Sequence, residues 1–152
     1  MTRRILTVAT LITVSVADGG DMHMAPSAQT WEEIGSNIYM YIGGCTVYCI
    51  RSGDEGVLIE TGDGSVTNAL SDIGVKRIAW VLHTHAHRDM TGGDNALAAC
   101  GARIAVPDGT QHLFDTAAAG WHDRELLNAF MYGDKYFMPL RDIPVDHVLT
   151  NG

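Results

Sequence analysis

Four side chains that can bind a metal ion lie within seven positions of this sequence: His83, His85, His87 and Asp89. The last three alternate along the chain, so in extended backbone their side chains point to the same side. Two imidazoles and a carboxylate suit zinc, and also iron or manganese. We therefore predict that His85, His87 and Asp89 bind a metal ion. The alternative is a polar strand end in which the histidines occur by chance.

The segments around this histidine-rich stretch predict a strand before it and a helix after it. The apolar run at 78–82 reads as a strand, and Gly92 and Gly93 allow a tight turn beside the ligands. A helix near 94–100 and a short strand at 103–106 follow. The metal ligands would then lie at the carboxyl end of a strand, where open α/β sheets usually place their sites.

Upstream of this unit the sequence predicts an antiparallel β-meander. Three β-rich runs, at 38–42, 45–50 and 57–59, are separated by turns rich in Gly and Asp. After them, Ser65 is positioned to cap a helix that ends at Gly74. One or two helices are expected within 110–133 and an extended segment within 143–150. The expected fold class is therefore α/β (α+β), with strands first and βα units after them.

Composition narrows the functional classes. The chain has 152 residues, enough for one domain, with 10 Lys and Arg against 18 Asp and Glu, a formal net charge of -8. Nucleic-acid binding depends on clustered cations, and the sequence has no basic cluster. We therefore expect a small-molecule substrate and no nucleic-acid partner.

The N-terminus predicts export. Residues 1–17 combine two arginines, a short apolar run and small residues at the expected cleavage site, as a secretory signal peptide does. The apolar run is too short to span a bilayer. The protein would be periplasmic or secreted. The alternative is a start at Met22 or Met24 and a cytoplasmic protein. We expect a flexible lead-in at 18–33 and one domain at 34–152.

The three cysteines are expected to be small apolar residues. Cys45 and Cys49 share a predicted strand, where they would lie about 13 Å apart, beyond the reach of a disulfide. Cys100 precedes a glycine at an expected helix end. The sequence contains no C-x-x-C motif, so neither a zinc knuckle nor a disulfide framework is expected.

From about Ile38 to Asn151 the sequence resembles the metallo-β-lactamase superfamily. Residues 80–89 match the T-H-x-H-x-D signature of that family, and residues 57–64 stand in place of its L-I-D-T-G-type loop. The resemblance implies an αβ/βα sandwich with the metals between the edges of two sheets. The part present here corresponds to the N-terminal half of that domain.

The resemblance also implies roles for individual residues. His85 and His87 would bind the first metal, and Asp89 would bind the second and orient or deprotonate the attacking water. Glu60 stands where the family usually has Asp. It would either hold a ligand imidazole in one tautomer or be a plain loop carboxylate, and His83 would be structural. The implied activity is zinc-dependent hydrolysis, with one or two Zn²⁺ and an ester, thioester, lactone or lactam bond as the target.

Two departures from the family pattern shape this interpretation. Met90 stands where the commonest binuclear members have a histidine ligand, which weighs against a glyoxalase-type thioesterase and against a nuclease. The family's remaining ligands belong to a second half that the sequence does not contain, and His112, His122 and His147 do not lie in the setting of those ligands. We therefore expect an incomplete hydrolase, truncated at its C-terminus.

An incomplete sandwich has consequences for partners and for function. It would leave one sheet face and one edge strand uncovered, so we expect a homodimer or a complementing chain to cover them. The alternative function is a non-catalytic, truncated metal-binding or interaction protein.

Overall fold

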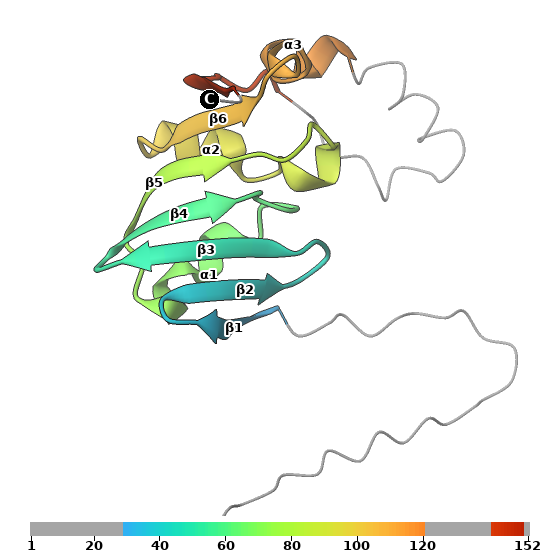
Figure 1. Cartoon of the computed structure of the whole chain (residues 1–152). Helices are drawn as coiled ribbons and strands as arrows, with labels where there is room; N and C mark the ends of the chain where they lie inside the picture. The colour runs from blue at the N-terminus through green and yellow to red at the C-terminus, as the bar shows by residue number, and fades with distance from the viewer. Residues whose placement is uncertain (1–28, 121–140, 151–152) are drawn as a thin grey trace, which may run out of the picture.

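The computed structural model describes residues 29–120 and 141–150, and within them a seven-stranded sheet has the order β1-β2-β3-β4-β5-β6-β7 (Figure 1). Every strand therefore pairs with its neighbours in the sequence. The strands are β1 Thr30–Gly35, β2 Ile38–Ile42, β3 Val47–Ser52, β4 Glu55–Ile59, β5 Arg77–Leu82, β6 Arg103–Pro107 and β7 His147–Leu149.

The sheet has an antiparallel half and a parallel half. Strands β1 to β4 pair antiparallel, and β4 to β7 pair parallel. The predicted meander is therefore confirmed, as are the strands β2 and β5 at their expected positions. Strand β3 begins at Val47, after the expected start at Cys45. Strand β1 begins at Thr30, before the start at 34 that we expected for the domain.

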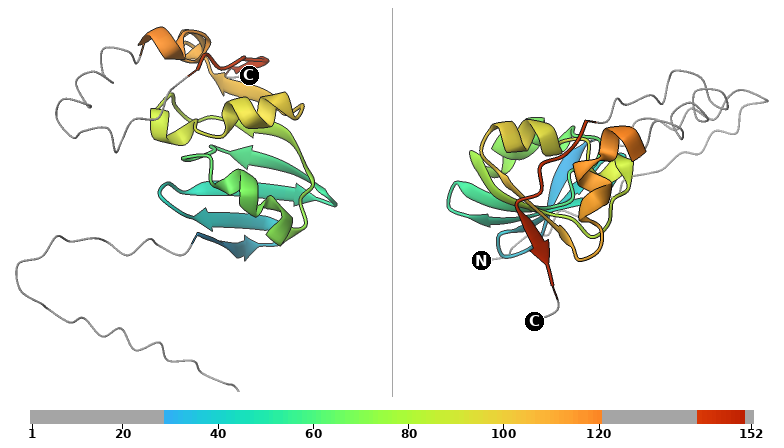
Figure 2. Two further views of the ribbon diagram at one scale, coloured as in Figure 1. Left: turned by 180° about the vertical axis from the view of Figure 1, so that it is seen from behind. Right: turned by 90° about the horizontal axis from the view of Figure 1, so that it is seen from above.

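The helices connect the parallel strands and cover one face of the sheet. Helix α1 (Val66–Ala69) continues as the 3-10 helix η1 (Leu70–Ile73), and α2 (Asp94–Ala99) follows the short 3-10 helix η2 (Arg88–Met90). Both α1 and α2 lie on the same side of the sheet (Figure 2). Their apolar side chains join those of the strands in one core, which includes Tyr41, Val47, Leu58, Val66, Val81, Leu97 and Ile104.

The ends of the first helix differ in part from the prediction. Gly74 ends η1 with a φ of 74°, as expected for a C-terminal glycine. The expected side-chain cap by Ser65 is wrong, because its hydroxyl donates instead to Asp63 Oδ1 at 2.6 Å. The carboxylate of Asp63 also accepts the backbone N–H of Ser65, at 2.9 Å. The loop before the helix thus satisfies its own polar groups.

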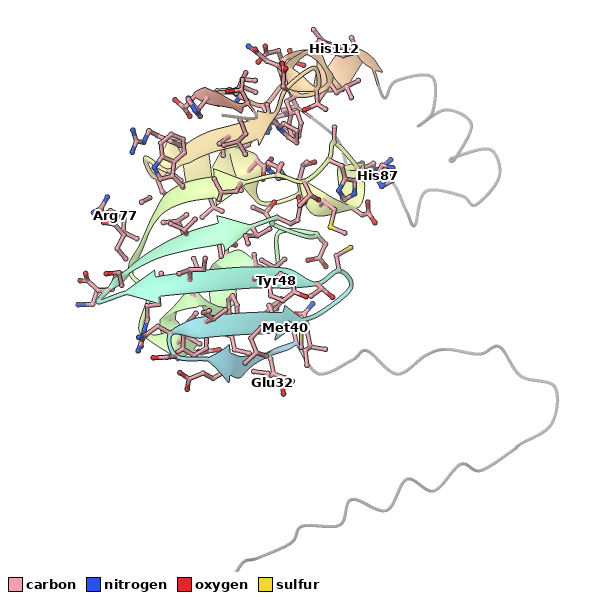
Figure 3. The ribbon with its side chains drawn as sticks, in the orientation of Figure 1. Glu32, Met40, Tyr48, Arg77, His87 and His112 are labelled. Carbon is pink, nitrogen blue, oxygen red and sulfur yellow. The ribbon has the colours of Figure 1, made fainter. Side chains whose placement is uncertain are left out.

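The opposite face of the sheet, here called the open face, presents apolar side chains to solvent. It carries Ile38, Ile42, Ile50 and Leu149, which are 38 to 46% exposed. Met40 and Tyr48, labelled in Figure 3, belong to the same face. Hydrophobic side chains of this size are usually buried in a monomer. The open face therefore has the composition of a surface that packs against another layer.

Several predictions fall wholly or partly outside the described residues. The expected helices at 110–133 are represented by α3 (Gln111–Asp115), whereas 121–133 and His122 lie beyond the part described. The expected extended segment at 143–150 contains β7. Residues 1–28, with the expected signal peptide and most of the lead-in, are also outside it. None of the helices in the described ranges is long and apolar enough to cross a bilayer.

Candidate metal centre

Two glycine-containing loops pack against each other beneath the predicted ligands. The first follows β4 and the second follows η2, and they are joined by hydrogen bonds from Thr61 N to Met90 O (2.9 Å) and from Gly92 N to Gly62 O (2.8 Å). A Cβ on Gly92 would lie 2.6 Å from the carbonyl carbon of Asp63. Only glycine permits this approach, which explains the spacing of the glycines in both loops.

Glu60 enters this arrangement in a left-handed backbone conformation, with a φ of 65°. Its N–H donates to Leu82 O at 3.0 Å, which ties the end of β4 to the end of β5. A positive φ is uncommon for a residue other than glycine and is retained where the surroundings enforce it. Here the residue is 5% exposed, and its side chain turns beneath the histidine loop.

His83 is buried between two carboxylates. Its Nδ1 lies 2.6 Å from Glu60 Oε2, and its Nε2 lies 2.9 Å from Asp94 Oδ2. The contact with Asp94 has the distance of an ion pair but not the alignment of a hydrogen bond. The second oxygen of Asp94 accepts the hydroxyl of Thr61 at 2.7 Å. The expected structural role of His83 agrees with this position, since it faces the interior and fills a polar site there.

The two carboxylates decide the protonation of His83. Burial, the largest single influence, disfavours the imidazolium, but the contacts with Asp94 and Glu60 outweigh it and raise the pKa of His83 to about 9. Burial likewise pushes the pKa of Glu60 upward, yet the hydrogen bonds from His83 and Thr84 bring it below its ordinary value. The metal-free protein thus holds a buried imidazolium between two carboxylates.

Thr84 connects this buried network to the first predicted ligand. Its N–H and its hydroxyl both reach Glu60 Oε1, at 2.8 and 2.5 Å. The same hydroxyl oxygen lies 2.7 Å from His85 Nδ1. Glu60 therefore supports His83 directly and His85 through Thr84. Glu60 thus reaches the His85 imidazole through Thr84 and is not an isolated loop carboxylate.

His85 and His87 lie side by side at the surface end of this network. Their ring centroids are 4.5 Å apart and the ring planes make an angle of 82°. Figure 3 shows His87 in the loop that follows β5. Both rings border a cavity of about 420 Å³, whose wall among the described residues also includes Thr84, Ala86, Thr110, Leu113, Thr116 and Gly120. This volume is within the usual range for small-molecule sites.

Asp89 faces a different neighbour. It lies in η2, and its Oδ2 accepts the thiol of Cys45 at 3.5 Å. Burial, followed by the charge of Asp89, raises the pKa of the Cys45 thiol. Within residues 29–120 and 141–150, no group of three or more His, Cys, Asp or Glu side chains is arranged to hold a metal ion. The structure thus pairs His85 with His87 and places Asp89 beside Cys45.

Three members of this site were not singled out from the sequence. Asp94 was read as a helix start, Thr61 as part of a loop, and Cys45 as a small apolar residue. Their hydrogen-bond partners are 29 to 44 positions away in the sequence, and the contact of Asp94 with His83 also depends on how the chain folds between them, so local patterns do not reveal these contacts. The remaining described histidines lie elsewhere: His112 is exposed on α3, and His147 stands 6.2 Å from the ring of Trp80 on the open face.

Comparisons with known proteins agree with this fold. The family model of the metallo-beta-lactamase superfamily matches residues 40–145. Over 58 residues the chain is 40% identical to a hydroxyacylglutathione hydrolase from Anaeromyxobacter dehalogenans, covering 38% of this chain and 23% of that protein.

Solved metallo-β-lactamases share the same architecture. The FEZ-1 enzyme from Legionella gormanii is similar with a TM-score of 0.62 and 21% identity, covering 84% of this chain and 48% of its own. The MIM-1 enzyme from Novosphingobium pentaromativorans gives a TM-score of 0.59 and 22% identity, covering 79% and 44%. The chain thus spans less than half the length of each of these relatives, and its single sheet with helices on one face corresponds to one αβ half of their fold.

The family model covers more than half of the sequence, including the whole histidine loop and the strands that position it. The chain belongs to the metallo-beta-lactamase superfamily, a family of metal-dependent hydrolases.

Proposed function

We propose that this chain carries part of the active site of a zinc-dependent hydrolase, in which His85 and His87 bind the metal and Asp89 acts on the attacking water. The observation that carries the proposal is the histidine pair, with ring centroids 4.5 Å apart on the wall of the cavity. Imidazole nitrogen is a common zinc ligand, and small-molecule sites are concave cavities with a few polar groups in their walls.

The donors present fit part of a zinc coordination sphere. The Nδ1 atom of His85 is engaged by Thr84 at 2.7 Å, which leaves its Nε2 as the metal-binding atom. His87 is exposed beside it. Zinc is usually four-coordinate, and in catalytic sites one position is open to water or substrate. The histidine pair supplies two positions and leaves the others to water or to donors that the described residues do not include.

The chemistry follows from these side chains. Zinc, when bound, supplies a water that is nucleophilic near neutral pH and polarises the bond under attack. The carboxylate of Asp89 is exposed and can accept the proton that this water loses. The cavity combines the hydroxyls of Thr110 and Thr116 with the apolar side chain of Leu113. It therefore suits a small molecule with an ester, thioester, lactone or lactam bond.

Two of these bonds are the first to test. The relative from Anaeromyxobacter dehalogenans is named a hydroxyacylglutathione hydrolase, and the similar solved structures are named metallo-β-lactamases. The first name points to a thioester and the second to a β-lactam. Met90, in place of the usual histidine, weighs against the thioester, so we rank the lactam first.

Metal content is the primary test. After dialysis against metal-free buffer, the wild-type chain is expected to retain about one zinc per chain, measured by inductively coupled plasma mass spectrometry. His85→Ala and His87→Ala are expected to lose it. His112→Ala is the matched control, because His112 is exposed on α3 away from the histidine pair. Equal zinc content in all four proteins would refute the assignment of the site.

Turnover separates the two functional candidates. Hydrolysis of a chromogenic lactam or thioester by the zinc-loaded chain, abolished in His85→Ala, supports the hydrolase. The second candidate is a metal-binding protein without catalysis. It is favoured by the lack of any third donor beside the histidine pair among the described residues. Retained zinc without hydrolysis of either substrate would support that candidate.

We also propose that a second copy of the chain covers the open face in solution. Two such faces could pack as aligned sheets, burying the exposed side chains of both. Ile50→Lys is expected to shift the chain toward a monomer in light scattering coupled to gel filtration. Leu113→Lys is the matched control, since Leu113 is equally exposed, at 46%, but lies on α3. A monomeric wild-type chain would contradict this proposal.

Export remains a proposal that rests on the sequence of residues 1–17. In a bacterial host the processed protein is expected to begin near Asp18 and to appear in the periplasmic or secreted fraction. Mass spectrometry of the intact protein from each fraction tests this. A full-length or Met22-initiated chain confined to the cytoplasm would contradict it.

A further inference from the structure

The hydroxyl of Thr84 lies between a buried carboxylate and the ring of the first predicted ligand. Its Oγ1 is 2.5 Å from Glu60 Oε1 and 2.7 Å from His85 Nδ1. Glu60 Oε1 and His85 Nδ1 are themselves 3.7 Å apart, too far for a direct hydrogen bond. Thr84 is therefore the link through which the carboxylate acts on the His85 ring.

The direction of these hydrogen bonds follows from the atoms involved. An ionised carboxylate only accepts hydrogen bonds, and a hydroxyl has one proton to donate. The Thr84 proton is therefore directed to Glu60, so the Thr84 oxygen is left to accept from His85 Nδ1. This arrangement requires a proton on Nδ1 and leaves the lone pair on Nε2.

The chain of contacts from Glu60 through Thr84 to His85, here called the relay, is held in place at Glu60. Glu60 is 5% exposed, and its second oxygen is engaged by His83 at 2.6 Å. Its backbone is held to β5 by the hydrogen bond to Leu82 O, at 3.0 Å. The backbone N–H of Thr84 also donates to the same carboxylate, at 2.8 Å. The carboxylate has little freedom to move away, so the orientation of the Thr84 hydroxyl is fixed.

We propose that Thr84 is a positioning residue: its hydroxyl, oriented by Glu60, fixes His85 in the tautomer with the proton on Nδ1 and presents Nε2 for metal binding. The inference rests on the proposed function, because it assigns His85 a metal-binding role. It goes further because it names the side chain that fixes the tautomer of His85 in the metal-free protein. The role assigned to Thr84 is to orient His85, although its side chain also borders the cavity.

The test compares three substitutions in the full chain. Thr84→Val keeps the shape and removes the hydroxyl, and Thr84→Ser restores the hydroxyl. Thr116→Val is the matched control. It removes a hydroxyl from the same cavity wall, but one that donates to His112 O at 2.7 Å and does not touch His85. Circular dichroism verifies folding, and Thr84→Ala replaces Thr84→Val if the latter does not fold.

The first readout needs no metal. Long-range ¹H–¹⁵N NMR of the histidine rings at pH 8 identifies the tautomer, with the His85 signals assigned by their loss in His85→Gln. Wild type, Thr84→Ser and Thr116→Val are expected to show Nδ1–H. Thr84→Val is expected to move toward Nε2–H, the form that predominates for histidine in water. An unchanged tautomer in Thr84→Val would overturn the inference.

The second readout is the zinc affinity, measured by competition with a chromophoric chelator. Loss of such a supporting contact is expected to weaken binding about 10- to 100-fold in Thr84→Val, whereas Thr84→Ser and Thr116→Val keep the wild-type affinity. Equal affinity in Thr84→Val and wild type would also overturn the inference. If wild type binds no zinc, the proposed function fails, and the tautomer measurement still decides whether the relay exists.

Discussion

Replacing His83 with leucine is expected to destabilise the fold more than any substitution at the surface of the site. His83 is 3% exposed, and its two partners Glu60 and Asp94 are 5 and 0% exposed. Without the imidazolium, two buried carboxylates would face each other with no cation between them. Removing one member of a buried ion pair costs about 3–5 kcal/mol, out of a total stability of about 5–15 kcal/mol for a domain.

The assay is urea unfolding of the metal-free chain at pH 7, followed by circular dichroism. With a urea dependence of about 1–3 kcal/mol per M, a loss of that size lowers the midpoint by about 1 M or more. Asp94→Asn, made both in wild type and in His83→Leu, separates the effect of charge from the effect of packing. Because the leucine variant has already lost the cation, the double variant should be less destabilised than the sum of the two single variants.

The result that would refute this reasoning is additivity. If His83→Leu and Asp94→Asn combine within about 0.5 kcal/mol of their sum, the two residues are not coupled. A loss below about 1 kcal/mol in His83→Leu would also refute it, since leaving a buried charge without its partner costs about 3–5 kcal/mol. Either result would mean that the carboxylates are neutral or hydrated in solution.

Two further predictions concern pH and loop packing. The folded-state pKa of His83, about 9, is above its ordinary value of 6.5. Its contribution to stability is therefore complete below pH 6.5 and is lost as the pH rises toward 9. The urea midpoint of the metal-free wild-type chain should be lower at pH 8.5 than at pH 6, and this difference should be much smaller in His83→Leu. Gly92→Ala is expected to cost about 1–3 kcal/mol by the same assay, because its Cβ would meet backbone at 2.6 Å. Gly120→Ala, whose Cβ meets nothing within 4 Å, is the control, and equal stability of the two variants would contradict the loop packing.

The regular elements were predictable because their signals are local. Strands β2 and β5 occur where alternation or a continuous apolar run predicted them, and Gly74 ends the first helix as expected. The spacing of His85 and His87 also indicated that the two rings would lie together, whereas Asp89, expected on the same side, lies against Cys45. In each case the neighbouring residues alone determine the backbone conformation and the direction of the side chain.

The buried part of the site was not predictable in this way. The pairing of His83 with Asp94 depends on how the loop after β5 folds back against the start of α2, and no periodicity encodes that contact. Ser65 shows the same limit on a smaller scale. Its residue type favours a helix cap, but the neighbouring carboxylate of Asp63 accepts its hydroxyl more directly.

The strand order has a consequence for how the chain folds. Among the described residues, each strand is hydrogen-bonded to the strand that precedes it in the sequence, so the sheet can grow in the direction of synthesis. A ribosome-bound chain that has emerged as far as Pro107 would already contain β1 to β6 and the loop between β5 and α2. The polar network around His83 could therefore form during translation, while Phe114, which packs 5.1 Å from the His83 ring, is still to be added.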